Sequence, residues 1–382
     1  MSSRSILISS DSHIIEPPDL WTERIDRAYR DRAPRVVREE KGDWWVIDGK
    51  RSMSFLGVQT GDRFEKDASE LIIEAHFENV RPAAYDPKRY VEENRQDGVE
   101  ASVIYPSEAL LVYGIPDAGF CSAAMRAYND YIAEFCSEDP LRLKGIALLN
   151  VDDPEEAADE LARCRKLGLA GAMITVLPPA DRPYDLPMYE PLWSAAADLE
   201  MPLSMHVATG RAAASVDTTQ TSVKEVKESA FYLQDHFVRK SIGEMVFSGV
   251  FERHPKLRIG SVEHEVSWAP FFLFQMDYTY TQRPIRGNWH RFADKSVLPS
   301  DFFKRQCFMS FQEDAIGMRE RETVGLQTLM WGSDYPHTES TFPRSREVLE
   351  RVLDGVPEAE REAITCDNVA RLYGFDLAAL RA

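Results

Sequence analysis

The first chemical feature of the sequence is an acid and an imidazole placed two residues apart near its start. In SILISSDSHIIEPPDLW, the apolar residues 6–8 lead to Asp11 and His13. Because residues i and i+2 of a strand face the same side, both side chains can enter one cavity. Imidazole and carboxylate without sulfur suit a divalent ion such as Zn, Mn or Fe. We therefore interpret this stretch as half of a metal site.

Ligand-type residues also follow three later apolar runs. LSMHVATG supplies His206, IGSVEHE supplies Glu263 and His264, and MWGSDYPH supplies Asp334 and His337. Each residue alone is more often a hydrogen-bonded core residue, a helix cap or a turn residue. Their joint occurrence at the ends of separate strands is what favours a metal site.

Eight short apolar runs set the expected fold, and most are followed by a helical pattern. Runs without polar alternation are typical of strands covered on both faces. Eight such units predict an α/β fold, a (β/α)8 TIM barrel, with active residues at the C-terminal strand ends. The rival, a doubly wound sheet, would show a Gly-rich turn after its first strand, and SSDSHI is not one. The runs are residues 6–8, 101–107, 143–150, 171–176, 202–207, 256–264, 307–311 and 328–334.

Residues 17–82 interrupt this repeat after the first strand. They contain KGDWWVIDGKRSM, in which Asp48 and Gly49 predict the turn of a β-hairpin. An insertion at this point would lie on the active-site face, so we expect a cap within one barrel domain spanning 1–382. Residues 209–235 form a second long, polar loop, of a length that is usually functional.

Composition narrows the classes of partner. The net charge of −18 over 382 residues argues against nucleic acid and anionic membranes, which attract basic surfaces. No stretch approaches the roughly 20 apolar residues of a membrane span, and the N-terminus is too polar for a signal peptide. Five scattered cysteines without a C-x-x-C pair suit a reducing compartment. We expect a cytoplasmic protein with a small-molecule substrate.

Four segments carry a family resemblance: DSHIIEPPDLW, PLSMHV, HPKLRIGSVEHEVSWAPFF and WGSDYPHTESTFP. They resemble the amidohydrolase superfamily, and more narrowly the amidohydrolase-2 branch with the aminocarboxymuconate-semialdehyde and resorcylate decarboxylases. The resemblance implies a metal-dependent barrel in which Asp11 and His13 are the paired first-strand ligands, His206 is the next ligand and Asp334 is the last. Asp11 stands where many members carry His, which leaves the identity and number of metal ions open.

The resemblance also implies a catalytic group on the sixth strand, where decarboxylases of the branch carry a His. Counting along the segment puts Glu263 at that position and His264 one residue later. Neighbours in a strand face opposite sides, so one of them should enter the barrel centre, and we favour Glu263. Asp334 or Glu263 could act as the base in hydrolysis, and a protonated Glu263 or His264 as the acid in decarboxylation.

Further residues are candidates for binding or support. His236, His337 and Arg344 could contact a substrate, since Arg can grip a carboxylate bidentately. Glu16 could orient His13 from behind, or cap the following turn. Dimers are usual for this resemblance, so we expect a homodimer or higher homo-oligomer.

The leading hypothesis is a metal-dependent hydrolase or non-oxidative decarboxylase of a small carboxylated or carbonyl-containing substrate. The same donor set would also suit a non-haem iron oxygenase, with one iron or two. A barrel that has lost its metal and serves as a binding protein is the third alternative. Metal analysis separates them: metal-free protein would exclude both enzymes, and iron with oxygen consumption would favour the oxygenase.

Overall fold

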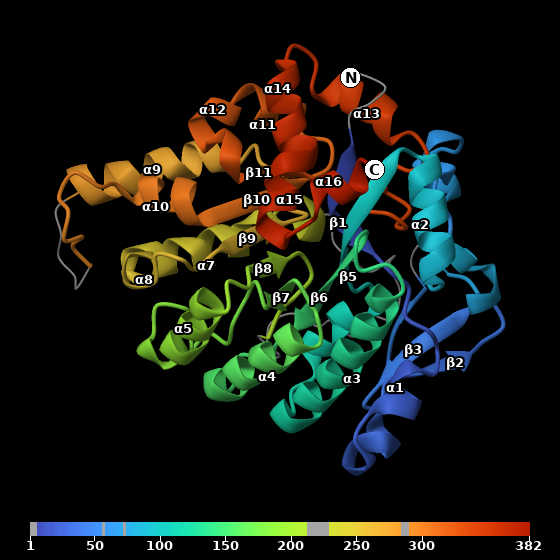
Figure 1. Ribbon diagram of the computed structural model, residues 1–382. Helices are drawn as coiled ribbons and strands as arrows, with labels where there is room; N and C mark the ends of the chain where they lie inside the picture. Colours follow the sequence, from blue (N-terminus) through green and yellow to red (C-terminus); the bar gives the residue numbers. More distant parts are fainter. Residues whose placement is uncertain (1–5, 56–57, 72–73, 212–228, 284–289) are drawn as a thin grey trace.

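Eight parallel strands form the centre of the fold, one for each run predicted from the sequence (Figure 1). The computed structural model describes residues 6–55, 58–71, 74–211, 229–283 and 290–382. The first and last strands lie side by side, since Ser10 Oγ donates to the carbonyl of Trp331 at 2.9 Å. The predicted TIM barrel is confirmed. In sheet order the strands are β1 Leu7–His13, β5 Val99–Tyr105, β6 Leu143–Leu148, β7 Gly171–Ile174, β8 Leu203–His206, β9 Ile259–Val262, β10 Cys307–Phe311 and β11 Leu329–Trp331.

Helices surround these strands, which explains why the strands lack polar alternation. Local sequence sets the helix ends: Asp153 accepts from the amides of Glu155 and Glu156 at the start of α4, and Pro154 occupies its first turn. The longer helices are α2 Pro87–Gln96, α3 Ala118–Ser137, α4 Pro154–Lys166, α5 Glu190–Asp198, α7 Asp235–Phe247, α9 Ala269–Gln282, α10 Pro299–Gln306 and α13 Ser345–Val352. The shorter ones are α1 Leu20–Arg24, α6 Ser229–Tyr232, α8 Val250–Arg253, α11 Ala315–Arg319, α12 Arg321–Val324, α14 Glu358–Glu362, α15 Asn368–Tyr373 and α16 Leu377–Leu380.

Six of the strands end earlier than the predicted runs. β9 ends at Val262 because Glu263 has a left-handed backbone with φ of 62°, and Asp334, three residues after the end of β11, has φ of 58°. A residue at positive φ cannot continue a strand, and for a non-glycine residue this conformation is strained. The first strand is instead longer than predicted and includes Asp11 and His13.

The insertion after β1 contains a small antiparallel sheet of β2 Arg35–Arg38, β3 Asp43–Ile47 and β4 Lys50–Ser54. The predicted hairpin is confirmed, with Asp48 and Gly49 at φ of 50° and 78° in its turn. Trp45 and Phe55 are buried against each other, with ring centroids 5.7 Å apart, so they form the core of this insertion.

The insertion also contacts the loop that follows β11. Thr60 Oγ1 donates to the carbonyl of Pro336, and Arg63 Nε donates to that of Ser340 at 2.7 Å. That the insertion caps the site stays a prediction. Residues 212–228 of the predicted loop 209–235 lie outside the described residues. Across the described ranges, no helix combines the length and the apolar character needed to cross a membrane.

Candidate functional site

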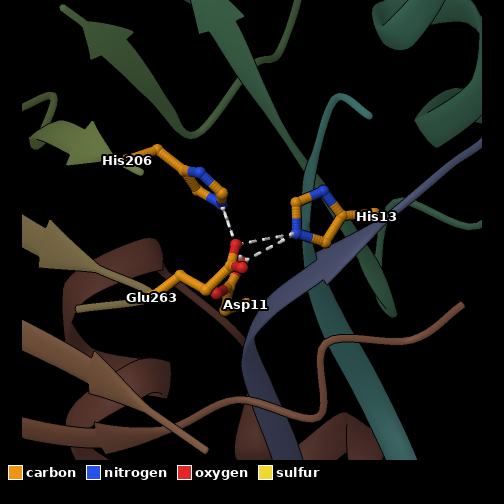
Figure 2. Close-up of side chains that lie close together, drawn as sticks. All are labelled: Asp11, His13, His206 and Glu263. Atoms are coloured by element: carbon orange, nitrogen blue, oxygen red, sulfur yellow. Dashed lines mark ion pairs between the residues drawn. The ribbon is translucent and has the colours of Figure 1, made fainter. Parts of the chain in front are cut away.

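Four ligand-type side chains converge at the C-terminal ends of β1, β8 and β9 (Figure 2). Asp11 Oδ1 lies 3.4 Å from His13 Nε2 and 3.7 Å from His206 Nε2. Glu263 Oε2 lies 3.1 Å from His206 Nε2 and 3.9 Å from His13 Nε2. Strand register explains part of this meeting, since His206 pairs with Val262 and Glu263 follows directly.

Backbone carbonyls orient the two imidazoles. His13 Nδ1 lies 2.7 Å from the carbonyl of Pro106, and His206 Nδ1 lies 3.1 Å from that of Val207. A carbonyl oxygen only accepts, so each Nδ1 carries a hydrogen and donates it. In the neutral ring Nε2 then holds the lone pair, which is the usual preparation of a His for metal binding.

The polar atoms at the centre of this cluster lack hydrogen-bond partners. Asp11 Oδ1, His13 Nε2, His206 Nε2 and Asp334 Oδ1 are buried, and none has a hydrogen bond to the described part of the chain. A buried polar atom left unpaired costs about 1–3 kcal/mol. The ligand atoms of Asp11, His13, His206 and Glu263 all lie within 4.8 Å of one another. Opposite ligands of one divalent ion are about 4–4.5 Å apart, so the group fits such an ion.

Asp334 also contacts the Nε2 atom of His13. Its Oδ1 lies 3.3 Å from His13 Nε2 and 2.8 Å from His337 Nδ1. The His337 ring stacks on the His13 ring at 4.0 Å between centroids. The amide of Asp334 donates to the carbonyl of Asp11 at 2.9 Å, which ties the loop after β11 to β1. We use the name central cluster for five of these side chains: Asp11, His13, His206, Glu263 and Asp334.

Charges in the central cluster shift one another's pKa values. Burial alone would raise the pKa of Asp11, but His13 and His206 hold it below its usual value. Burial would likewise lower the pKa of His13, but Asp11 and Asp334 raise it well above its ordinary value. The pKa of Glu263 is raised by burial and by the carboxylates of Asp334 and Asp11. The cluster combines three carboxyl groups with two imidazoles, an acidic donor set that suits a divalent cation.

Glu263 and His264, which both follow the end of β9, have different surroundings. Glu263 faces the imidazoles, and its side chain is a quarter exposed. His264 is buried, its Nδ1 lies 3.2 Å from Ser261 Oγ, and burial lowers its pKa to about 3. Its Nε2 has no hydrogen bond within the described ranges. Both residues therefore remain candidates for proton transfer.

Other predicted residues lie away from these contacts. His236 is exposed at the start of α7, and Arg344 is exposed with its guanidinium 5.1 Å from the ring of Phe64. Their predicted contact with a substrate stays a prediction. Glu16 does not reach His13 by a hydrogen bond in the described structure; its carboxylate accepts from the amides of Glu108 and Ala109 at 2.9 and 3.0 Å.

Sequence reasoning missed one polar neighbour of the cluster. Ser107 is buried two residues beyond the end of β5, and its Oγ lies 2.8 Å from His337 Nε2. Its position after a barrel strand, in YPS, was the available indication.

Comparison with known proteins agrees with this geometry. Residues 75–375 match the profile of the family described as Amidohydrolase. A gamma-resorcylate decarboxylase of Rhodococcus jostii (strain RHA1) is 27% identical over 297 residues, which cover 72% of this chain and 84% of that protein. An amidohydrolase from Mycobacterium avium subsp. paratuberculosis K-10 superposes with a TM-score of 0.78 at 18% identity, covering 98% and 100% of the two chains. A dihydroxybenzoic acid decarboxylase from Polaromonas sp. JS666, with bound manganese and the inhibitor 2-nitroresorcinol, gives 0.68 at 17% identity, covering 98% and 99%.

Proposed function

This chain belongs to the amidohydrolase family, and from that premise we propose that it is a metal-dependent, non-oxidative decarboxylase of a small carboxylated aromatic compound. As a member of this family the chain is an enzyme, so the alternative of a non-catalytic binding protein is not retained. The observation that carries the proposal is the set of buried, unpartnered oxygen and nitrogen atoms in the central cluster. The name of the Rhodococcus relative supports the reaction. The named relatives lend no support to an oxygenase.

We propose Asp11, His13, His206 and Asp334 as the metal ligands, with Glu263 in reach of the same ion. The manganese in the Polaromonas neighbour favours Mn over the Zn and Fe that the donor types also allow. When bound, such an ion supplies positive charge that attracts the carboxylate and adjacent hydroxyl oxygens of a substrate.

The chain's own residues hold the proposed ligands in place and supply the proton that the substrate's ring carbon receives. In the reaction the bond between ring carbon and carboxylate breaks, its electron pair stays on the ring carbon, a proton adds there and CO₂ leaves. Glu263 is the proposed proton carrier because its carboxyl group faces the cluster and is partly open. His264, with its unpartnered Nε2, is the alternative. The donated Nδ1 hydrogen bonds of His13 and His206 keep both rings in place throughout.

A deuterium experiment tests the reaction type. Manganese-loaded protein is incubated in D₂O with 2,6-dihydroxybenzoate and related hydroxybenzoates, and the products are analysed by NMR. We expect CO₂ release, one deuterium at the carbon that lost the carboxylate, and no oxygen consumption. Turnover of an ester or amide without CO₂ would indicate a hydrolase instead, and oxygen consumption would indicate an oxygenase.

Two substitutions separate the candidates for the acid. Glu263→Gln should lower kcat by about 10²–10⁴-fold, the usual contribution of a positioned acid. His264→Asn should have a much smaller effect, with manganese content measured in both variants. The opposite ranking, with metal retained, would assign the proton to His264.

A homo-oligomer in a reducing compartment remains a proposal. The exposed face of α9 carries Phe271, Phe274 and Tyr278, which are 64%, 59% and 45% exposed. Apolar residues so grouped support a contact with another copy. All five cysteines are free and buried, which suits a reducing environment. Light scattering of the wild type and of Phe271→Glu would test the interface.

A further inference from the structure

Three side chains, Ser107, His337 and Asp334, form a line of close polar contacts that ends in the central cluster. Ser107 Oγ lies 2.8 Å from His337 Nε2, and His337 Nδ1 lies 2.8 Å from Asp334 Oδ1. A carboxylate can only accept, so the neutral tautomer that suits this 2.8 Å contact carries its hydrogen on Nδ1. Nε2 is then an acceptor, and the Ser107 hydroxyl must donate to it. The hydroxyl therefore decides which nitrogen of His337 carries the hydrogen.

The start of this line is anchored by a buried carboxylate. The two amides that follow Ser107, those of Glu108 and Ala109, donate to Glu16 at 2.9 and 3.0 Å. Glu16 is fully buried, three residues after His13. The backbone that carries the hydroxyl is thus bound to the segment that follows β1. Ser107 Oγ is thereby kept within hydrogen-bond distance of His337 Nε2.

The other end of the line is Asp334, whose backbone is already constrained. Its φ of 58° turns the chain out of the barrel direction, and its amide is bound to the carbonyl of Asp11. Backbone geometry alone leaves the rotation of the carboxylate open. The Nδ1–H of His337 is the contact that selects one rotation, with Oδ1 also 3.3 Å from His13 Nε2.

We propose that Ser107 and His337 are positioning residues that hold the Asp334 carboxylate in the orientation needed to bind the metal ion. This role rests on the proposed function, because it takes Asp334 as a ligand. Removing the hydroxyl would let His337 adopt its other tautomer, which presents a lone pair to Asp334 in place of a donor. Loss of such an outer contact typically weakens metal binding about 10–100-fold.

Manganese affinity, measured by electron paramagnetic resonance of the free ion, tests the role without depending on turnover. Ser107→Ala should bind manganese about 10–100-fold more weakly than the wild type, and Ser107→Thr, which keeps the hydroxyl, should restore the affinity. Ser241→Ala is the matched control: it removes an equally buried hydroxyl, which donates to the carbonyl of Val176 at 2.8 Å. The control should bind as the wild type does.

Substitutions at His337 test the same role if the Ser107 variants fold poorly. The amide of His337→Asn can still donate to Asp334, whereas His337→Leu cannot. The Asn variant should therefore bind manganese more tightly than the Leu variant. Equal affinities would contradict the positioning role.

Nitrogen NMR of histidine-labelled, metal-free protein gives a second readout. The sequence has eight histidines, and the His337 signal is the one missing from His337→Gln. We expect the Nδ1–H tautomer in the wild type and a shift toward Nε2–H in Ser107→Ala. A wild type without manganese binding would overturn the proposed function. Wild-type binding with unchanged affinity in Ser107→Ala, or an Nε2–H tautomer in the wild type, would overturn only the positioning role.

Discussion

Two buried ionic groups occupy the same end of the barrel and differ in how their atoms are paired. In the central cluster, facing atoms of Asp11, His13 and His206 have no hydrogen bond within the described residues. In the second group, which we call the arginine clamp, Arg211 Nε donates to Asp152 Oδ1 at 3.2 Å and a second nitrogen donates to Asp152 Oδ2. Arg211 Nη1 also donates to the carbonyl of Tyr113 at 2.9 Å.

This difference in pairing distinguishes an ion pair that stabilises the fold from a group of side chains that can bind a ligand. Tyr113, Asp152 and Arg211 follow strands β5, β6 and β8. The side chains of Arg211 and Asp152 are only 5% and 10% exposed, and their charged atoms are paired with each other. Such a pair holds loops together and needs no ligand. The central cluster is equally buried but incomplete, and a cation would complete it. Both groups are buried, so the acidic donor set and the gathering of unpaired donor atoms are the properties that mark the site.

The largest expected effect is the loss of activity when one side chain of the central cluster is removed. His206→Ala should bind no manganese and lose activity by on the order of 10³-fold or more, because the ion's contribution disappears. Its metal-free form should unfold within about 2 kcal/mol of the wild type, the ordinary range for a truncation. Metal analysis and urea unfolding measure both. Unchanged metal content would remove His206 from the ligand set.

Removing one partner of the arginine clamp should lower the stability of the fold. Arg211→Met leaves Asp152 buried without its partner and should lower the free energy of unfolding by about 3–5 kcal/mol. The double variant Arg211→Met with Asp152→Leu should recover most of this loss, since no charge is then left unpaired. Urea unfolding of both proteins gives the comparison. A double variant as unstable as the single one would show that the clamp acts through packing alone.

Asp97 sharpens the comparison because it is buried and its carboxylate accepts hydrogen bonds from Ser345, through the amide at 3.0 Å and through the hydroxyl. Burial outweighs these donors and raises its pKa from 3.8 to about 6. Between these pH values the unfolded chain loses the proton first, so stability should fall as pH rises from 4 to 6 and then level off.

The measurable size of this effect is roughly 2–3 kcal/mol, at 1.36 kcal/mol for each unit of pKa. Asp97→Asn removes the titration, so its stability relative to the wild type should rise by that amount between pH 4 and pH 7. Urea unfolding at both pH values tests it. Parallel pH curves for the two proteins would contradict the raised pKa.

The smallest expected effect is on the stability of variants at two glutamates, each of which has a strained backbone. Glu263 and Glu265 have φ of 62° and 55°, and glycine would relieve strain of about 1 kcal/mol at each. The Glu265 carboxylate accepts from the amides of Gln312 and Glu313, both at 3.2 Å, whereas Glu263 faces only the cluster. Glu263→Gly should therefore be neutral or stabilising in the metal-free protein, and Glu265→Gly destabilising. Thermal unfolding of the two variants decides whether pairing or backbone strain dominates.

Much of the fold and several site residues could be predicted because their indications are local. Strands covered on both faces appear as short apolar runs, and all eight were visible in the sequence. Asp11, His13, His206 and Asp334 each lie in or just after such a run, where a barrel collects polar groups. The choice of Glu263 over His264 as the residue facing the imidazoles followed from counting and alternation, and the structure has Glu263 there.

Other features depend on residues far apart in the chain. Arg211 and Asp152 are 59 positions apart, and Ser107 and His337 are 230 apart, so no local pattern indicates either pair. The left-handed backbones at Glu263 and Asp334 could not be predicted either, because positive φ is uncommon for Glu and, although Asp adopts it more often, most Asp residues do not.

By itself the sequence determined the donor types and the strands that deliver them, since both follow from residue chemistry and local periodicity. Only the tertiary structure decided which donor atoms stay unpaired. Whether a buried carboxylate is a clamp or a ligand depends on which hydrogen-bond donors the other strands bring to it. Asp152 meets a guanidinium and is complete, whereas Asp11 meets two imidazoles whose backbone contacts turn lone pairs toward it. We propose that an ion from outside the chain completes the contacts of Asp11 and its neighbours.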